Sequence, residues 1–122
     1  LFAGAGFTVI GLAGLGAPLS PTTGLHILSV GSLGLAVLSV FIIAGLRHTG
    51  RPLILPWQAH GALILMTGAG LVRILPELGF AQAVFASHYS VSATLWSLAF
   101  ALWLVGFMPL LRHPLNETDH CG

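Results

Sequence analysis

The chain has 122 residues, of which 56% are hydrophobic and 6% charged. Soluble domains carry about 25% charged residues, so four basic and three acidic side chains exclude a soluble globular protein of this size. A formal net charge of +1 provides no basic surface for nucleic acid, and a single cysteine cannot form an internal disulfide. We therefore predict an all-α fold, a polytopic bundle of four transmembrane helices in a lipid bilayer.

The first predicted span covers about residues 1–19. Its many glycine and alanine residues permit close helix packing in a bilayer. Pro18 and Pro21 are expected to end this span and begin the next, with Thr22 or Thr23 as the N-cap. The span begins without a methionine or a charged segment, so it does not read as a signal peptide. We expect it to continue a longer protein.

The second predicted span, about residues 24–46, lies between His26 and His48. No Asp, Glu, Lys or Arg interrupts the stretch from His26 to Arg47. At a rise of about 1.5 Å per residue, the run from His26 to His48 is roughly 33 Å long, close to the thickness of one hydrocarbon core. The sequence therefore predicts a membrane-spanning helix with a metal-competent imidazole at each interface.

The third and fourth predicted spans cover about residues 57–75 and 89–111. Trp57 is expected to anchor the third span at the membrane interface, where tryptophan is enriched. The four spans together form one membrane region, residues 1–113, and residues 114–122 form a polar C-terminal tail.

The basic residues predict the orientation of the bundle. When four spans alternate in direction, Arg47, Arg51 and Arg112 lie on one side of the membrane and Arg73 lies on the other. Cytoplasmic loops carry an excess of Lys and Arg. The C-terminus is therefore expected to be cytoplasmic.

The same alternation places His26 and His88 together on the outer face. Imidazole is a common ligand of haem iron, so we expect these two residues to be axial ligands of a b-type haem between the helices. Arg73 and Tyr89 lie on the same side and are expected to meet the haem propionates. The alternative is that both histidines are polar interface residues without a ligand.

On the inner face, His48 and His60 flank a short loop, and we expect them to bind one copper ion or to form an alternative haem site. His113 or Met108 would supply a third ligand. The alternative is that these side chains provide only interfacial polarity and hydrogen bonds within the loop.

Arg73 is a charged residue within a predicted span. Unpaired charge is costly in hydrocarbon, which makes such a residue a functional candidate. Glu77, four residues later, is its expected partner; alternatively, Arg73 extends to the lipid headgroups. The sequence contains neither G-x-S-x-G nor a Walker motif, and no catalytic residue is assigned.

The run from Leu25 to Leu53, LHILSVGSLGLAVLSVFIIAGLRHTGRPL, resembles the signature of the NnrS family, in which a histidine opens a glycine-rich span that closes in HTGR. The last span, LWSLAFALWLVGFMPLLRHP, is similar to the terminal helix of that family. The resemblance covers essentially the whole chain and corresponds to a C-terminal four-span portion of a longer member. One departure is Ile42 and Ile43, which stand where the family pattern has a Thr-Arg pair.

NnrS-like proteins are bacterial inner-membrane proteins that carry haem and copper and are associated with nitric oxide metabolism. The resemblance implies the same multi-pass location and the same two cofactors, haem b and copper. By position it carries over to His26 and His48. The implied function is haem and copper binding that supports nitric oxide handling or electron transfer.

Two other functions are compatible with the sequence. One is a cofactor-free structural or assembly subunit of a larger membrane complex, because Gly, Ala and Ser faces favour helix–helix packing. The other is a pathway for protons or a small molecule, lined by Arg73 and the histidines. Glycine-rich spans with few polar pairs are expected to need partners, namely the remaining spans of a longer chain, a homo-oligomer or a larger complex.

Overall fold

The computed structural model describes residues 2–16, 20–79 and 87–113, in which helices are joined by turns and loops and no strand occurs. The predicted all-α fold is confirmed. The elements are α1 (Phe2–Gly16), α2 (Pro21–His26), the π-helix η1 (Ile27–Leu33), α3 (Gly34–His48), α4 (Trp57–Ile74) and α5 (His88–Arg112). The predicted polar tail, residues 114–122, lies outside the described residues.

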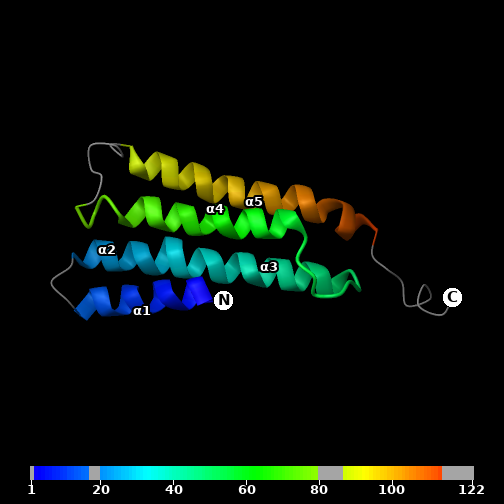
Figure 1. The fold of residues 1–122 in the computed structure, drawn as a ribbon, viewed down its shortest axis with the longest axis horizontal. Coiled ribbons are helices and arrows are strands. Elements are labelled where there is room, and N and C mark those ends of the chain that lie inside the picture. The colour runs from blue at the N-terminus through cyan, green and yellow to red at the C-terminus, as the bar shows by residue number, and fades with distance from the viewer. Residues whose placement is uncertain (1, 17–19, 80–86, 114–122) are drawn as a thin grey trace.

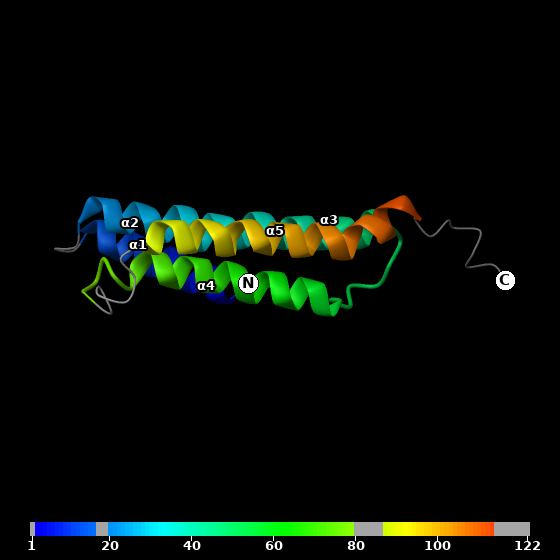
Figure 2. The same ribbon diagram turned by 90° about the horizontal axis from the view of Figure 1, so that it is seen from above.

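Four helical rods lie side by side along one axis (Figures 1 and 2). α2, η1 and α3 form one continuous rod, Pro21–His48, and α1, α4 and α5 are the other three. Successive rods run in opposite directions, and α1 lies along only the first part of the second rod (Figure 1). α4 contacts α5 as well as η1 and α3, so it links the two halves of the bundle.

Among the described residues, two helices are long and apolar enough to cross a membrane, namely Pro21–His48 and His88–Arg112. α1 contains a shorter apolar stretch, Gly4–Ala13. Most of α5 is exposed, including large apolar side chains such as those of Leu98 and Val105. Extended apolar surface of this kind marks contact with a membrane or with another protein.

The buried core follows one face of each helix. On α3 it consists of Leu35, Leu38, Ile42 and Leu46, which recur every three or four residues as expected for a helical stripe. The buried stripe of α4 consists mainly of alanine, with Met66 at its centre. Because alanine is small, the helices that pack on this face approach α4 closely.

η1 and α4 meet at two glycines. A Cβ on Gly70 would lie 3.2 Å from Cα of Gly31, and a Cβ on Gly31 would lie 2.6 Å from the ring of Phe7. The ring of Phe7, from α1, is buried in the space that these glycines leave. The π-helical segment at this crossing was not predicted; such segments are rare and are frequent at functional sites.

The start of α2 differs from the expected one. Ser20 is the N-cap, rather than Thr22 or Thr23. Its carbonyl accepts the N–H groups of Thr23 (3.0 Å) and Gly24 (3.3 Å). Pro21 occupies the first helical position, where its fixed φ is favourable and its missing N–H costs nothing, so the helix begins earlier than the threonines suggest.

The HTGR sequence closes α3 as a Schellman cap. Gly50 has a φ of 68°, and its N–H donates to the carbonyl of Arg47 (3.1 Å). The N–H of Arg51 donates to the carbonyl of Leu46 (3.0 Å), and these two bonds define the cap. The buried hydroxyl of Thr49 donates to carbonyls of the last turn of α3. Helix termination therefore accounts for the Thr and the Gly of this motif.

We predict that Gly70→Ala lowers the free energy of unfolding by about 1–3 kcal/mol, because the new methyl group must displace the backbone of Gly31 or the ring of Phe7. Gly68→Ala is the matched control on the same helix, since its nearest contact is an ordinary 4.0 Å and alanine favours helix over glycine. Unfolding of both variants in the same detergent measures the difference. Equal stabilities would contradict the close crossing.

Candidate functional site

A polar cluster lies at the end of the bundle where α2 and α5 begin and α4 ends (Figure 1). His26 is the last residue of α2, and Arg73 lies in the last turn of α4. Glu77 lies in the turn after α4, and Tyr89 is the second residue of α5. We call these four residues the His26 cluster. Three separate segments of the chain supply its side chains.

The imidazole of His26 joins an acidic and a basic side chain. Its Nδ1 lies 2.7 Å from Oε1 of Glu77, and its Nε2 lies 3.3 Å from Nη2 of Arg73. The side chains of His26 and Glu77 are only 19% and 13% exposed. The spacing of Arg73 and Glu77 predicts a direct ion pair, but the structure links the two through the imidazole, which α2 places between them.

The ring of Tyr89 is the common contact of the three residues predicted to bind haem. Cζ of Arg73 lies 4.0 Å from its centroid, in a cation–π arrangement. The ring centroids of His26 and His88 lie 6.0 Å and 4.1 Å from that of Tyr89. The Tyr89 hydroxyl also donates to Oε1 of Glu77 over 3.4 Å. The structure therefore gathers His26, Arg73 and His88 around one aromatic ring.

Within the part of the chain that the structure describes, two polar atoms of the cluster are buried without a hydrogen-bond partner, Nε of Arg73 and Oε2 of Glu77. Most buried polar atoms in proteins are paired, so one donor and one acceptor remain here for water or a ligand. A cavity of about 240 Å³ adjoins Arg73 and is lined on α5 by Ser92, Trp96 and Ser97. Both serine hydroxyls already donate to helix carbonyls. The guanidinium of Arg73 is the charged group that lines this cavity.

The donor chemistry of the cluster fits a b-type haem. Haem iron takes imidazole as an axial ligand, and propionates pair with guanidinium groups. His26 and His88 provide the imidazoles, and Arg73 provides a cation with a buried N–H that no atom of the described residues accepts.

The opposite end of the bundle holds His48, His60 and His113 (Figure 1). His48 and His60 are exposed, and Nδ1 of His60 lies 3.2 Å from the carbonyl oxygen of Pro56. In the part of the chain that the structure describes, no group of three His, Cys, Asp or Glu side chains is placed to hold a metal ion. The predicted third ligand His113 is therefore not assembled with the other two, and Met108 is exposed.

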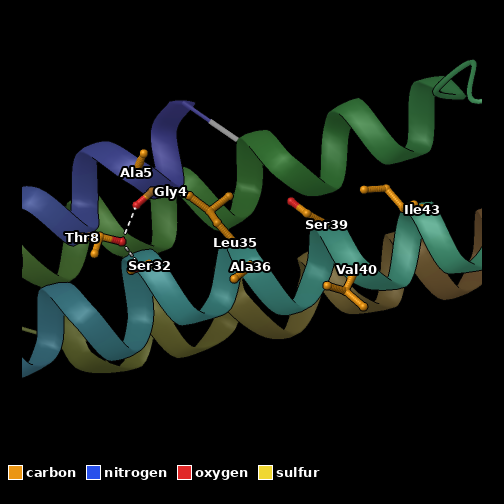
Figure 3. A pocket seen from close by; sticks show the side chains of 9 residues that line it. All are labelled: Gly4, Ala5, Thr8, Ser32, Leu35, Ala36, Ser39, Val40 and Ile43. Atoms are coloured by element: carbon orange, nitrogen blue, oxygen red, sulfur yellow. Dashed lines mark hydrogen bonds between the residues drawn. The ribbon is translucent and has the colours of Figure 1, made fainter.

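A groove of about 370 Å³ lies between α1 and the second rod (Figure 3). The hydroxyls of Thr8 and Ser32 hydrogen-bond to each other beside it, and Thr8 also donates to the carbonyl of Gly4 (2.9 Å). Its lining consists of small, apolar and hydroxyl side chains, without a charge or an imidazole. Its chemistry is that of a helix-packing surface.

The contacts that Glu77 and Tyr89 make in the cluster were not predicted from the sequence. Glu77 is the only acidic residue that precedes the C-terminal tail, and Tyr89 is the only tyrosine of the chain. Polar residues that are rare in an apolar chain are functional candidates. Their rarity was the signal from which both could have been selected.

We predict that Tyr89→Leu lowers the free energy of unfolding by roughly 1–2 kcal/mol, because it removes the cation–π contact with Arg73 and the ring contact with His26. Tyr89→Phe is the control, since it keeps the ring and loses only the hydroxyl contact with Glu77, a loss of at most about 1 kcal/mol. Denaturant unfolding in detergent measures both. A Phe variant as unstable as the Leu variant would show that the hydroxyl, rather than the ring, holds the cluster together.

Similarity to a known family extends over almost the whole chain. No curated protein and no solved structure matches it significantly. The family described as NnrS protein matches residues 1–114 of the 122. This range includes the whole helical bundle and every residue of the His26 cluster. The chain therefore belongs to the NnrS family of membrane proteins.

Proposed function

We propose that this chain binds haem b within the membrane and supports nitric oxide handling or electron transfer. The observation that carries the proposal is the convergence of His26, Arg73 and His88 on the ring of Tyr89. Membership of the NnrS family supports the physiological setting. The imidazole and guanidinium groups, and their location at the ends of three helices, support haem as the cofactor.

In this proposal His26 and His88 would hold the haem iron through their imidazoles. Arg73 pairs with a propionate through its guanidinium. When bound, the haem supplies an iron that exchanges electrons or binds a diatomic gas. The protein contributes a shielded imidazole, because Glu77 and Tyr89 cover His26 and limit its exposure to 19%.

We propose a copper ion at the opposite end of the bundle, with His48 and His60 as its ligands. The contact of His60 supports this proposal. Its Nδ1 lies 3.2 Å from the carbonyl of Pro56, which only accepts, so Nδ1 carries the proton and Nε2 carries the lone pair. Metal-ligating histidines commonly donate their second nitrogen in this way. A copper ion there would join the end of α3 to the start of α4.

A cofactor-free structural or assembly subunit is the second candidate. The uncharged groove between α1 and the second rod favours it (Figure 3), as does the exposed apolar surface of α5. Both are suited to helix packing. In this alternative the His26 cluster serves only to neutralise charge inside the bundle.

We propose that all four rods cross the bacterial inner membrane and that the C-terminus is cytoplasmic. Arg47 and Arg51 follow or end α3, and Arg112 ends α5, so they share the end of the bundle that lies opposite Arg73. An excess of arginine marks the cytoplasmic side. The exposed apolar surfaces favour further spans, additional copies of the chain or a larger complex as partners.

We predict that the chain purified from haem-supplemented cells shows a Soret band, with split α and β bands after reduction by dithionite. His26→Ala and His88→Ala should lose or reshape these bands, because each removes a proposed axial ligand. His48→Ala and His60→Ala are the matched controls, which should keep the haem spectrum and lower the copper content. A colourless wild-type protein with blank metal analysis would contradict the proposal and favour the structural subunit.

Cys121, the single cysteine, reports the orientation. We predict that a membrane-impermeant maleimide leaves Cys121 unlabelled in spheroplasts and labels it after the membrane is broken. Cys121→Ser combined with Thr22→Cys is the control, because exposed residue 22 lies at the start of α2, at the end of the bundle opposite Arg112, and should react in intact spheroplasts. Labelling of Cys121 in intact spheroplasts would place the C-terminus outside.

A further inference from the structure

The contacts around His26 fix the position of its ring proton. A guanidinium has donors and no acceptor. In the 3.3 Å contact between Nη2 of Arg73 and Nε2 of His26, the imidazole nitrogen must therefore accept. A neutral imidazole has one N–H and one lone pair. The proton then resides on Nδ1, which donates it over 2.7 Å to Oε1 of Glu77.

The carboxylate of Glu77 is itself held in a fixed position. It belongs to the turn after α4, in which the N–H of Leu78 donates to the carbonyl of Ile74 (3.1 Å). This turn ends at Gly79, whose φ of 89° suits glycine. The Tyr89 hydroxyl donates to the same oxygen that accepts from His26. The imidazole of His26 and the hydroxyl of Tyr89 thus meet at the same carboxylate oxygen.

We propose that Glu77 is a positioning residue that selects the Nδ1–H tautomer of His26 and orients its ring, so that Nε2 carries the lone pair. The inference deepens the proposed function, in which Nε2 is the nitrogen that ligates iron. Metal-ligating histidines donate their other N–H to a carboxylate or a carbonyl in most sites. Arg73 covers Nε2 in this structure. If Nε2 held a cofactor, the guanidinium of Arg73 would be available to donate to an anionic group of that cofactor.

A neutral side chain at position 77 should weaken the preference of His26 for the Nδ1–H tautomer. The amide of glutamine presents a carbonyl or an NH₂ group to Nδ1, so it accepts from one tautomer and donates to the other. Hydrogen bonds to a charged acceptor are also stronger than those to a neutral one. We expect Glu77→Gln to lower the ratio of Nδ1–H to Nε2–H at His26 by roughly tenfold.

The test is ¹⁵N NMR of the full chain with labelled histidine, in detergent at mildly alkaline pH, without added haem or metal. Two-bond ¹H–¹⁵N correlations distinguish the two tautomers, and His26→Gln identifies the signals of residue 26. Glu117→Gln, in the polar tail, is the matched control and should leave the tautomer unchanged. The conservative variant Glu77→Asp should restore part of the Nδ1–H population. Circular dichroism checks that each variant keeps its helices.

Wild-type His26 in the Nδ1–H form, with a lower Nδ1–H to Nε2–H ratio in Glu77→Gln, would support the inference. An Nε2–H form of His26 in the wild type would overturn the inference, even if the variant fails to fold. The same tautomer ratio in the wild type and in Glu77→Gln would also overturn it. Haem titration of the same samples tests the proposed function separately. A Glu77-dependent tautomer without haem uptake would leave the inference standing and reject the haem site. Haem binding that depends on His26, together with a tautomer ratio that does not depend on Glu77, would support the haem site and reject the inference.

Discussion

The close approach of η1 and α4 at Gly31 and Gly70 is the contact on which the rest of the structure depends. Without side chains at these positions, the two backbones come together and leave a space that Phe7 fills. His26 lies five residues before one of these glycines, and Arg73 lies three residues after the other. The crossing therefore sets the separation of the two polar residues. A hydrophobic packing contact in this way determines the geometry of a polar site.

The two ends of the second rod use their histidines differently. At one end, His26 is enclosed and both of its ring nitrogens are engaged by charged partners. At the other end, the HTGR motif is largely a helix cap, since Gly50 adopts a positive φ and the hydroxyl of Thr49 donates to a carbonyl of α3. His48, by contrast, is exposed. The HTGR motif thus combines a backbone requirement with one histidine that is available for chemistry.

Much of the fold could be predicted from the sequence, because apolar runs bounded by proline define the helices and alternation of direction assigns their ends. His26, Arg73 and His88 were placed at one end by that reasoning alone. The link through Glu77, the central position of Tyr89 and the early cap at Ser20 were not predicted. These features depend on how each helix is rotated about its axis. Hydrophobic periodicity fixes that rotation poorly when glycine and alanine occupy several faces and a π-helical segment shifts the register.

That π-helical segment sets the register between the two ends of the second rod. It separates His26 from α3, whose leucine and isoleucine stripe is anchored in the core. A π-bulge accommodates about one extra residue relative to an α-helix, and one residue corresponds to about 100° of rotation. If the segment rewound into α-helix while α3 stayed in place, the imidazole of His26 would turn away from both Glu77 and Arg73. The wide turn of η1 thus keeps the ring of His26 directed at Glu77 and Arg73.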